Sequence, residues 1–299
     1  MSLFSKIALA FRKLKKVKNS KLEDYYFTSL FGVSKKNVSK YFLRETDFKN
    51  LPAPIFFLST GRCGTNWFEK LLSHDKNLCV FHEPTPNLAI QGKRAFELNS
   101  GNLSANENEL LKEVFLSARE HYLRHSFKAD KQYVETNNHL TFLASQIAEI
   151  IPHAKFVHLY RHPGEFVTSA MNREFFSENN HEDIKRIKPL TAENWEGYNQ
   201  IEKCSWLWNE TNLFIEEFKL KNDNVFSFNF NELSKEKVMG LISFLDLNIS
   251  ENSIESLLTV KSNVQKTKRF NKYENWEGKD QLALKNICKE LSDKYNYKL

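Results

Sequence analysis

A glycine-containing loop in the stretch PIFFLSTGRCGTNWFEKLL, residues 54–72, has the residue types of an anion-binding site. Gly61 and Gly64 allow positive φ and close approach of a ligand to the backbone, and Arg62 adds a planar set of donors. A loop of this kind that leads into a helix directs N–H groups and the positive end of the helix dipole at an anion. It lacks the lysine and hydroxyl residue of the ATP-binding pattern G-x-x-x-x-G-K-[ST]. Taken alone, the stretch is also compatible with an ordinary strand–turn–helix corner.

A second stretch, FVHLYRHPGEFVTSAMNREFF, places an arginine at the end of a strand pattern and a hydroxyl group on the helix that follows. Ser169 and Arg173 share one helix face because they are four residues apart. Arg161 and Ser169 together could hold a phosphate through charge-assisted hydrogen bonds. The alternative for this stretch alone is a surface salt-bridge motif. Together the two stretches predict two anion sites at one edge of a sheet, beyond the carboxyl ends of its strands.

These motifs resemble the two signatures of sulfotransferases that use 3′-phosphoadenosine 5′-phosphosulfate (PAPS). STGRCGTNWFEKLL is similar to the loop that binds the 5′-phosphosulfate in that family, and YRHPGEFVTSAMNR is similar to its 3′-phosphate signature, an arginine followed eight residues later by a serine. The resemblance extends over roughly residues 53–297. It implies a PAPS-dependent sulfotransferase, without a metal, that moves a sulfuryl group by in-line transfer to a hydroxyl of a sugar, glycolipid or other small acceptor.

The resemblance also implies which residues bind the donor. Those implied to bind the 5′-phosphosulfate are Arg62, Cys63, Gly64, Thr65 and Asn66, and those implied to bind the 3′-phosphate are Arg161 and Ser169. Arg62 also suits the catalytic task of stabilising the departing 5′-phosphate. Two positions depart from the common pattern. Arg62-Cys63 replaces the Lys-Ser of many cytosolic members, which is closer to the branch that includes carbohydrate sulfotransferases, and His162 stands where an aspartate is often found.

Sulfuryl transfer also needs a base that takes the proton of the acceptor. The stretch FHEPTP follows the predicted strand LCVF and places His82 and Glu83 at a carboxyl end. Histidine titrates near neutrality, and a glutamate can serve where burial raises its pKa. Glu135, at the end of YVET, is a third candidate, and the sequence leaves the choice open. Four other histidines lack metal-ligand spacing and are predicted to be structural: His74, His139, His153 and His158.

Two further features near these motifs have alternative interpretations. The segment VQKTKRFNKYENW holds Lys266, Lys268, Arg269 and Lys272 beside Phe270, Tyr273 and Trp276. The family resemblance implies a C-terminal loop that closes over the donor, with a cation at the 3′-phosphate and an aromatic beside the adenine; a solvated basic loop is the alternative. Cys63 lies near a helix N-terminus, which favours a lowered pKa and a reactive thiol.

Alternating strand and helix patterns must position these side chains. The predicted strands are residues 54–59, 78–81, 133–136, 155–160 and 224–230, and the predicted helices include 107–125, 139–151, one that begins at Pro163, 201–218, 234–247 and 279–295. This alternation predicts an α/β fold, a three-layer sandwich with a central parallel sheet and a P-loop-like sulfotransferase topology. Residues 85–105 and 174–195 are predicted to be loops that build the acceptor pocket.

Composition sets the class of protein and its compartment. Forty-one per cent apolar residues, with 25 Phe in 299 residues, allow a sizeable core. The four cysteines have no CxxC spacing and so favour a reducing, cytoplasmic location. No run approaches the roughly 18 apolar residues of a membrane span.

Positive charge is concentrated in an N-terminal arm. The net charge is +6, of which residues 1–44 contribute +9 and the remaining 255 residues contribute −3. The body therefore lacks the basic field of a nucleic-acid-binding protein. Residues 1–18 form a basic amphipathic pattern that suits peripheral contact with an anionic membrane, or an N-terminal helix packed on the body. We predict an arm over residues 1–45 and one sulfotransferase domain over residues 46–299; the oligomeric state is not indicated.

Two other functions remain as alternatives to a sulfotransferase. One is a P-loop kinase or NTPase with an altered phosphate loop, which the missing Walker lysine disfavours. The other is a catalytically inactive nucleotide-binding protein, which would bind the desulfated donor without transferring a sulfuryl group.

Overall fold

The computed structural model describes residues 51–178, 180–191, 195–259 and 270–299. The predicted arm of residues 1–45, with its amphipathic segment 1–18, lies outside the described residues. Lys266, Lys268 and Arg269 of the C-terminal basic segment also lie outside them.

The described chain is built on a five-stranded sheet in the order β2-β3-β1-β4-β5. The strands are β1 (Ile55–Leu58), β2 (Leu78–Phe81), β3 (Gln132–Glu135), β4 (Lys155–Tyr160) and β5 (Val225–Asn229). Every pairing is parallel, with Phe56 opposite both Glu135 of β3 and Phe156 of β4. Strand order changes direction on either side of β1, so the carboxyl end of β1 is where a ligand is expected to bind.

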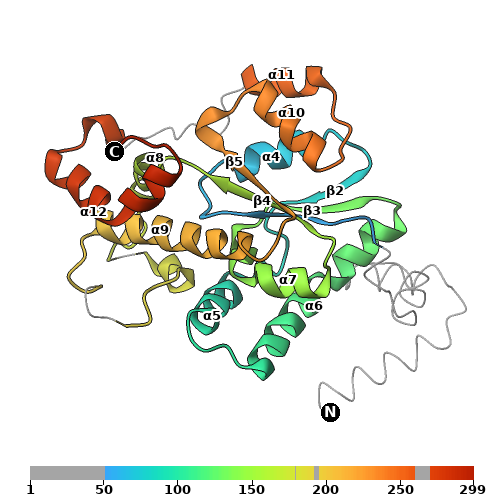
Figure 1. Ribbon diagram of the computed structural model, residues 1–299, viewed down its shortest axis with the longest axis horizontal. Coiled ribbons are helices and arrows are strands. Elements are labelled where there is room, and N and C mark those ends of the chain that lie inside the picture. Colours follow the sequence, from blue (N-terminus) through green and yellow to red (C-terminus); the bar gives the residue numbers. More distant parts are fainter. Residues whose placement is uncertain (1–50, 179, 192–194, 260–269) are drawn as a thin grey trace, which may run out of the picture. The chain divides into compact units, whose positions relative to one another are not determined.

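Helices cover both faces of this sheet, giving three layers (Figure 1). On one face lie α4 (Thr65–Leu72), α10 (Lys235–Phe244) and α11 (Glu251–Thr259). On the other lie α5 (Ala89–Asn99), α6 (Ala105–Lys128), α7 (Ala144–Ile150), α8 (Pro163–Met171), α9 (Gln200–Lys219) and α12 (Gly278–Lys294). Short 3₁₀ turns complete the fold: η2 (Asn138–Leu143), η3 (His181–Lys185), η4 (Phe230–Glu232) and η5 (Tyr273–Asn275).

Strand β1 shows why the sheet is buried on both faces. Its side chains alternate, so that Ile55 and Phe57 pack into the core beside α4 and α10, while Phe56 and Leu58 pack into the core beside α6 and α9. All four side chains are fully buried. A continuous apolar run of this kind is typical of a central strand in a parallel sheet.

The structure confirms the predicted fold class, an α/β sandwich with a central parallel sheet. All five predicted strands are present, and Ser234 caps α10 by accepting from the Lys237 amide. Two predictions are wrong. Residues 89–99 are the helix α5 rather than loop, and the predicted helix 139–151 begins as the 3₁₀ turn η2 and becomes α-helical only at Ala144. None of the helices in the described ranges is both long and apolar enough to cross a membrane.

Candidate active site

A cavity of about 760 Å³ opens at the carboxyl ends of the strands. It is lined by the loop after β1, by the loops after β2 and β3, by the start of α8 and by residues after the gap at 260–269. The two predicted anion motifs both contribute to it: the lining includes Arg62, Gly64, Thr65 and Asn66 from the first, and Arg161 and Ser169 from the second.

The loop after β1 has the backbone shape of an anion cradle. Gly61, Arg62 and Gly64 have φ of 73°, 57° and 101°, which lie in the left-handed region. Gly64 is the N-cap of α4, and no side chain caps this helix. The first-turn N–H groups of a helix have no partner within it, so this end of α4 offers donors and a partial positive charge to the cavity.

Direct hydrogen bonds join the two motifs. Arg62 Nε donates to Ser169 Oγ at 3.1 Å, and Arg161 Nη1 donates to the Arg62 carbonyl oxygen at 3.2 Å. Both arginines therefore face one cavity rather than opposite sides of the molecule. Glu165 pairs with Arg161 at 2.6 Å, so a bound phosphate would share this guanidinium with a carboxylate that is 38% exposed.

Crowding of positive charge marks the site electrostatically. Burial, followed by the nearby guanidinium groups of Arg173 and Arg161, lowers the pKa of Arg62 from its ordinary value. Arginine stays protonated even so, because its unperturbed pKa is above 12. Three like charges held near one another favour binding of a ligand with several negative charges.

His162, which stands where an aspartate is often found, caps helix α8. Its Nδ1 accepts a hydrogen bond from the Gly164 amide at 3.1 Å and so caps α8. Its Nε2 donates to the Lys298 carbonyl oxygen at 3.1 Å, which ties the C-terminal residues to the start of the same helix. The histidine at this position thus both caps α8 and contacts the C-terminal residues.

Aromatic rings line the cavity and pack closely against two of the glycines. A Cβ at Gly64 would lie 2.2 Å from the Phe230 ring, and one at Gly164 would lie 2.3 Å from the Tyr273 ring. Phe270 and Lys272 line the same wall, whereas Trp276 is buried behind it. Phe270, Lys272 and Tyr273, which belong to the predicted donor-closing segment, thus line the cavity to which both anion motifs contribute.

The other half of the cavity holds the candidate bases His82 and Glu83. The His82 Nδ1 lies 2.9 Å from both the carbonyl oxygen and the side-chain hydroxyl of Thr136, so these two groups hold the imidazole at the cavity wall. Glu83 is exposed and has a φ of 46°, a strained conformation for a residue with a side chain. Strain of this kind is common at functional sites.

His139 belongs to the same group, although the sequence analysis classed it as structural. It lines the cavity, and burial lowers its pKa; the Glu83 carboxylate opposes this by raising it, while Arg186 and Lys185 lower it further. These charges place Glu83, Arg186 and Lys185 around the imidazole. No local pattern marked His139, because its charged neighbours come from two separate parts of the sequence, Glu83 and the pair Lys185 and Arg186.

Glu135, the third candidate base, has a different environment. It is fully buried and does not line the cavity. Its carboxylate accepts from Arg119 Nε at 2.7 Å and Nη2 at 2.8 Å, from Tyr133 at 2.5 Å and from Asn137 at 2.9 Å. A carboxylate held by four donors and away from the cavity is not available to an acceptor, so the prediction that it could be the base is not supported.

The Arg119–Glu135 pair instead holds the loop that carries Glu83. Arg119 Nη1 donates to the Pro86 carbonyl oxygen at 2.8 Å, and Asn137 bridges from Glu135 to the Asn87 carbonyl oxygen at 3.0 Å. A buried ion pair is costly unless its remaining hydrogen-bonding groups are satisfied, and here they are. The pair therefore fixes the loop after β2 against the end of β3.

Cys63 turns away from the cavity. Its side chain is 1% exposed, lies 3.0 Å from the Thr60 hydroxyl and donates to the Gly61 carbonyl oxygen at 3.1 Å. Burial raises the pKa of the thiol to about 11. The expectation of a reactive cysteine is therefore wrong, and the sulfur of Cys63 does not reach the cavity.

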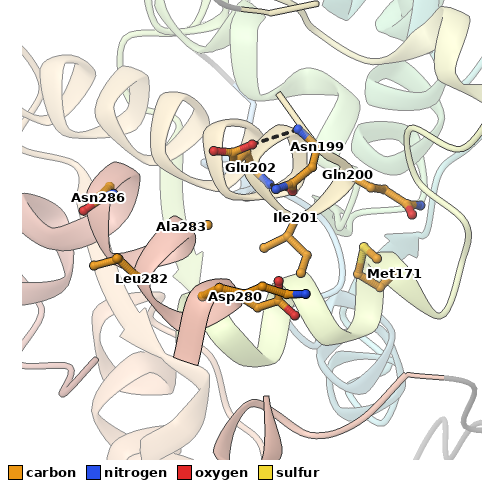
Figure 2. A pocket seen from close by; sticks show the side chains of 10 residues that line it. Met171, Asn199, Gln200, Ile201, Glu202, Asp280, Leu282, Ala283 and Asn286 are labelled. Atoms are coloured by element: carbon orange, nitrogen blue, oxygen red, sulfur yellow. Dashed lines mark hydrogen bonds between the residues drawn. The ribbon is translucent and has the colours of Figure 1, made fainter. Parts of the chain in front are cut away.

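A second cavity, of about 660 Å³, lies where α9 and α12 begin, beside the end of α8 (Figure 2). Its polar side chains serve the local helix: Asn199 and Glu202 form a capping box, in which the Asn199 amide donates to Glu202 at 2.8 Å. No cluster of converging cations comparable to that of the first cavity is present among its lining residues.

The comparisons with known proteins agree with this arrangement. A family model described as "Sulfotransferase family" matches residues 54–233, which span β1 through η4 and both anion motifs. The chain belongs to the sulfotransferase family. A comparison with curated proteins finds no match.

A solved sulfotransferase shares this fold. The sulfotransferase STF9 from Mycobacterium avium is similar with a TM-score of 0.52 and 12% identity, over 96% of this chain and 86% of that chain. The sulfotransferase domain of the Synechococcus PCC 7002 olefin synthase has a TM-score of 0.49 and 16% identity, over 86% of this chain and 98% of that domain. At such identities the likeness concerns the fold alone, and the site rests on the side chains described above.

Proposed function

We propose that this sulfotransferase uses PAPS as its sulfuryl donor and transfers the sulfuryl group in line to a hydroxyl of a sugar, glycolipid or other small acceptor. The observation that carries the proposal is the meeting of the two anion motifs, in which Arg62 bonds Ser169 and Arg161 bonds the Arg62 carbonyl. One adenylate with phosphate groups at both ends fits such a pair. The loop lacks the Walker lysine and the neighbouring hydroxyl residue that binds magnesium, which disfavours a kinase.

Each motif has its own task in donor binding. The cradle formed by Arg62, Gly64, Thr65 and Asn66 would hold the 5′-phosphosulfate, and Arg161 with Ser169 would hold the 3′-phosphate. The Phe230 ring packs against Gly64 of the first motif and the Tyr273 ring against Gly164 of the second, and a purine could stack on these rings. PAPS supplies the activated sulfuryl group, and its leaving phosphate requires positive charge, which Arg62 and the amides at the start of α4 provide.

Glu83 and His139 are the groups proposed to take the acceptor's proton. His139 is neutral at physiological pH because burial lowers its pKa, and a neutral imidazole can accept a proton. The Glu83 carboxylate can orient the His139 imidazole and offset the positive charge that the imidazole gains with the proton. His82 lines the same cavity and is held through Nδ1 at Thr136, so it is the second candidate for the same role.

The test is sulfuryl transfer from radiolabelled PAPS to a panel of sugars, glycolipids and phenols. Label transfer to a hydroxyl acceptor without added magnesium is expected. Magnesium-dependent ATP turnover would instead favour a kinase. Binding of the desulfated donor, 3′-phosphoadenosine 5′-phosphate (PAP), with no transfer to any acceptor would favour an inactive nucleotide-binding protein. A cytoplasmic location, and membrane contact through residues 1–18, stay predictions; flotation of the intact protein with anionic liposomes tests the latter.

A further inference from the structure

A pair of cations faces the proposed bases across the acceptor half of the cavity. Lys185 and Arg186 end the 3₁₀ turn η3, and both line the cavity together with Glu83 and His139. Both residues lie in the segment 174–195, which is predicted from the sequence to help build the acceptor pocket.

Arg186 is held in place by a ring contact and by a hydrogen bond that uses one of its N–H donors. Its guanidinium lies over the Phe175 ring at 3.2 Å from the centroid, and Phe175 is itself 8% exposed. Asp183 accepts from Arg186 Nε at 2.6 Å. An arginine that is stacked on a ring and bonded at Nε is pre-organised, and less entropy is lost when its Nη groups bind an oxyanion.

Lys185 adds a second positive charge beside it. Its ammonium group pairs at 2.5 Å with Glu182, whose side chain is 68% exposed and therefore well screened by solvent. Asp183 is 12% exposed and is engaged with the Nε side of Arg186. Asp183 does not line the cavity, whereas Glu182 does, so an oxyanion bound there would compete with the Glu182 carboxylate for Lys185.

We infer that Lys185 and Arg186 form a subsite for an oxyanion that the acceptor carries near the hydroxyl group to be sulfated. The inference rests on the proposed function and narrows its acceptor class from any small hydroxyl compound to an acidic one, with a carboxylate, phosphate ester or sulfate ester. Charge-assisted, bidentate recognition by arginine suits all three groups.

This subsite would also affect the proposed base. Arg186 and Lys185 both lower the pKa of His139 in the structure, after the larger effect of burial and against the opposite effect of Glu83. An anion bound between the cations and the imidazole offsets their field, so the pKa of His139 rises and it becomes a stronger base. An acidic acceptor would in this way assist its own deprotonation.

The test is a titration of the protein saturated with PAP, so that the two anion motifs proposed to bind the donor are already occupied. The probes are inorganic sulfate, methyl β-D-glucuronide and the neutral methyl β-D-glucoside, and the readout is the NMR titration of His139, assigned with His139→Gln. Sulfate, the glucuronide or both are expected to bind and to raise the pKa of His139, while the glucoside does neither. The two anionic probes distinguish a sulfate- or phosphate-type group from a carboxylate.

Variants of Lys185 and Arg186 test whether the anions bind at these two residues. Arg186→Gln and Lys185→Gln should each weaken anion binding by about tenfold, the scale of one charged hydrogen bond, with PAP affinity unchanged. Arg94→Gln is the matched control, because Arg94 is 65% exposed, pairs with Glu97 and does not line the cavity. The inference is overturned if neither anion binds, if the glucoside binds equally well, or if the variants bind the anions like the wild type. Failure of the wild type to bind PAP would instead contradict the proposed function.

Discussion

His139 shows how a single side chain gains a function from residues distant in sequence. In the sequence it follows a pair of asparagines and carries no recognisable motif. In the structure it is surrounded by Glu83 from the loop after β2 and by Lys185 and Arg186 from η3. Cys63 shows the reverse: its place beside a helix N-terminus suggested a reactive thiol, but burial removes it from solvent.

The lowered pKa of His139 predicts how activity depends on pH. A general base must be deprotonated, and the His139 pKa lies below the ordinary histidine value of about 6.5. Activity should therefore persist as the pH falls to about 6.5 and decline only at lower pH, as the imidazole becomes protonated. The measurement is the pH profile of kcat/KM for the wild type.

His139→Gln provides the comparison for that profile. The substitution should lower kcat by a factor of about 10² or more, the usual contribution of a general base, and should remove the acidic limb assigned to His139. PAP affinity should not change, because His139 lies on the acceptor side. An unchanged acidic limb in this variant would assign the titrating group to another residue, such as His82.

At the level of elements, the strands and the two motifs were predictable because their signals are local. The apolar run of β1 is followed within a few residues by the glycines of its loop, and Arg161 directly follows the apolar run of β4. Helix α5 was missed because its buried face consists of Ala89, Gly92, Ala95 and Phe96, which is a weak apolar pattern. Gly92 allows α5 to approach η2 closely, because a Cβ at this position would meet the backbone of His139.

Gly92→Ala should disturb the acceptor side in particular. A Cβ at this position would lie 2.2 Å from the His139 carbonyl oxygen, so α5 or η2 must move. Overpacking of this kind costs about 1–3 kcal/mol of unfolding free energy. Urea unfolding measures the loss, and sulfuryl transfer should fall while PAP affinity is retained.

Gly240→Ala is the matched control, since the nearest atom to its Cβ is the Phe226 ring at 4.0 Å. This change within α10 should be neutral or stabilise the protein by about 0.5–1 kcal/mol. Equal behaviour of the two variants would show that close packing at Gly92 does not position His139.

The buried Arg119–Glu135 pair links elements in a way that the sequence does not reveal. Glu135→Gln removes one partner and leaves a buried guanidinium charge, which should cost about 3–5 kcal/mol of unfolding free energy. Hydrogen exchange should accelerate at the backbone amides of the non-proline residues between 83 and 89, because Arg119 and Asn137 hold this segment through its carbonyl groups.

Glu97→Gln, which breaks the exposed pair with Arg94, should cost about 0–1 kcal/mol and leave this loop unchanged. If Glu135→Gln left the exchange of residues 83–89 at the wild-type rate, the loop would owe its position to other contacts.

At the scale of the whole molecule, the topology brings the parts of the site together. Strand β1 lies between β3 and β4, so the loop after β1 meets the acceptor-side loop on one flank and the Arg161 helix on the other. Thr141 reinforces the first contact by accepting from the Ser59 amide at 3.0 Å and donating to the Ser59 carbonyl oxygen at 3.1 Å. Strand order could not be derived from the sequence, because pairing depends on contacts between distant segments.

The most direct test of the donor site is calorimetric binding of two nucleotides that differ only in the 3′-phosphate, PAP and 5′-AMP. The wild type should bind PAP more tightly by at least about tenfold, which corresponds to about 1.5–3 kcal/mol for a charged hydrogen bond. Arg161→Ala should remove this difference and leave the affinity for 5′-AMP unchanged. If Arg161→Ala weakened both nucleotides equally, or neither, the two motifs would not hold opposite ends of one donor.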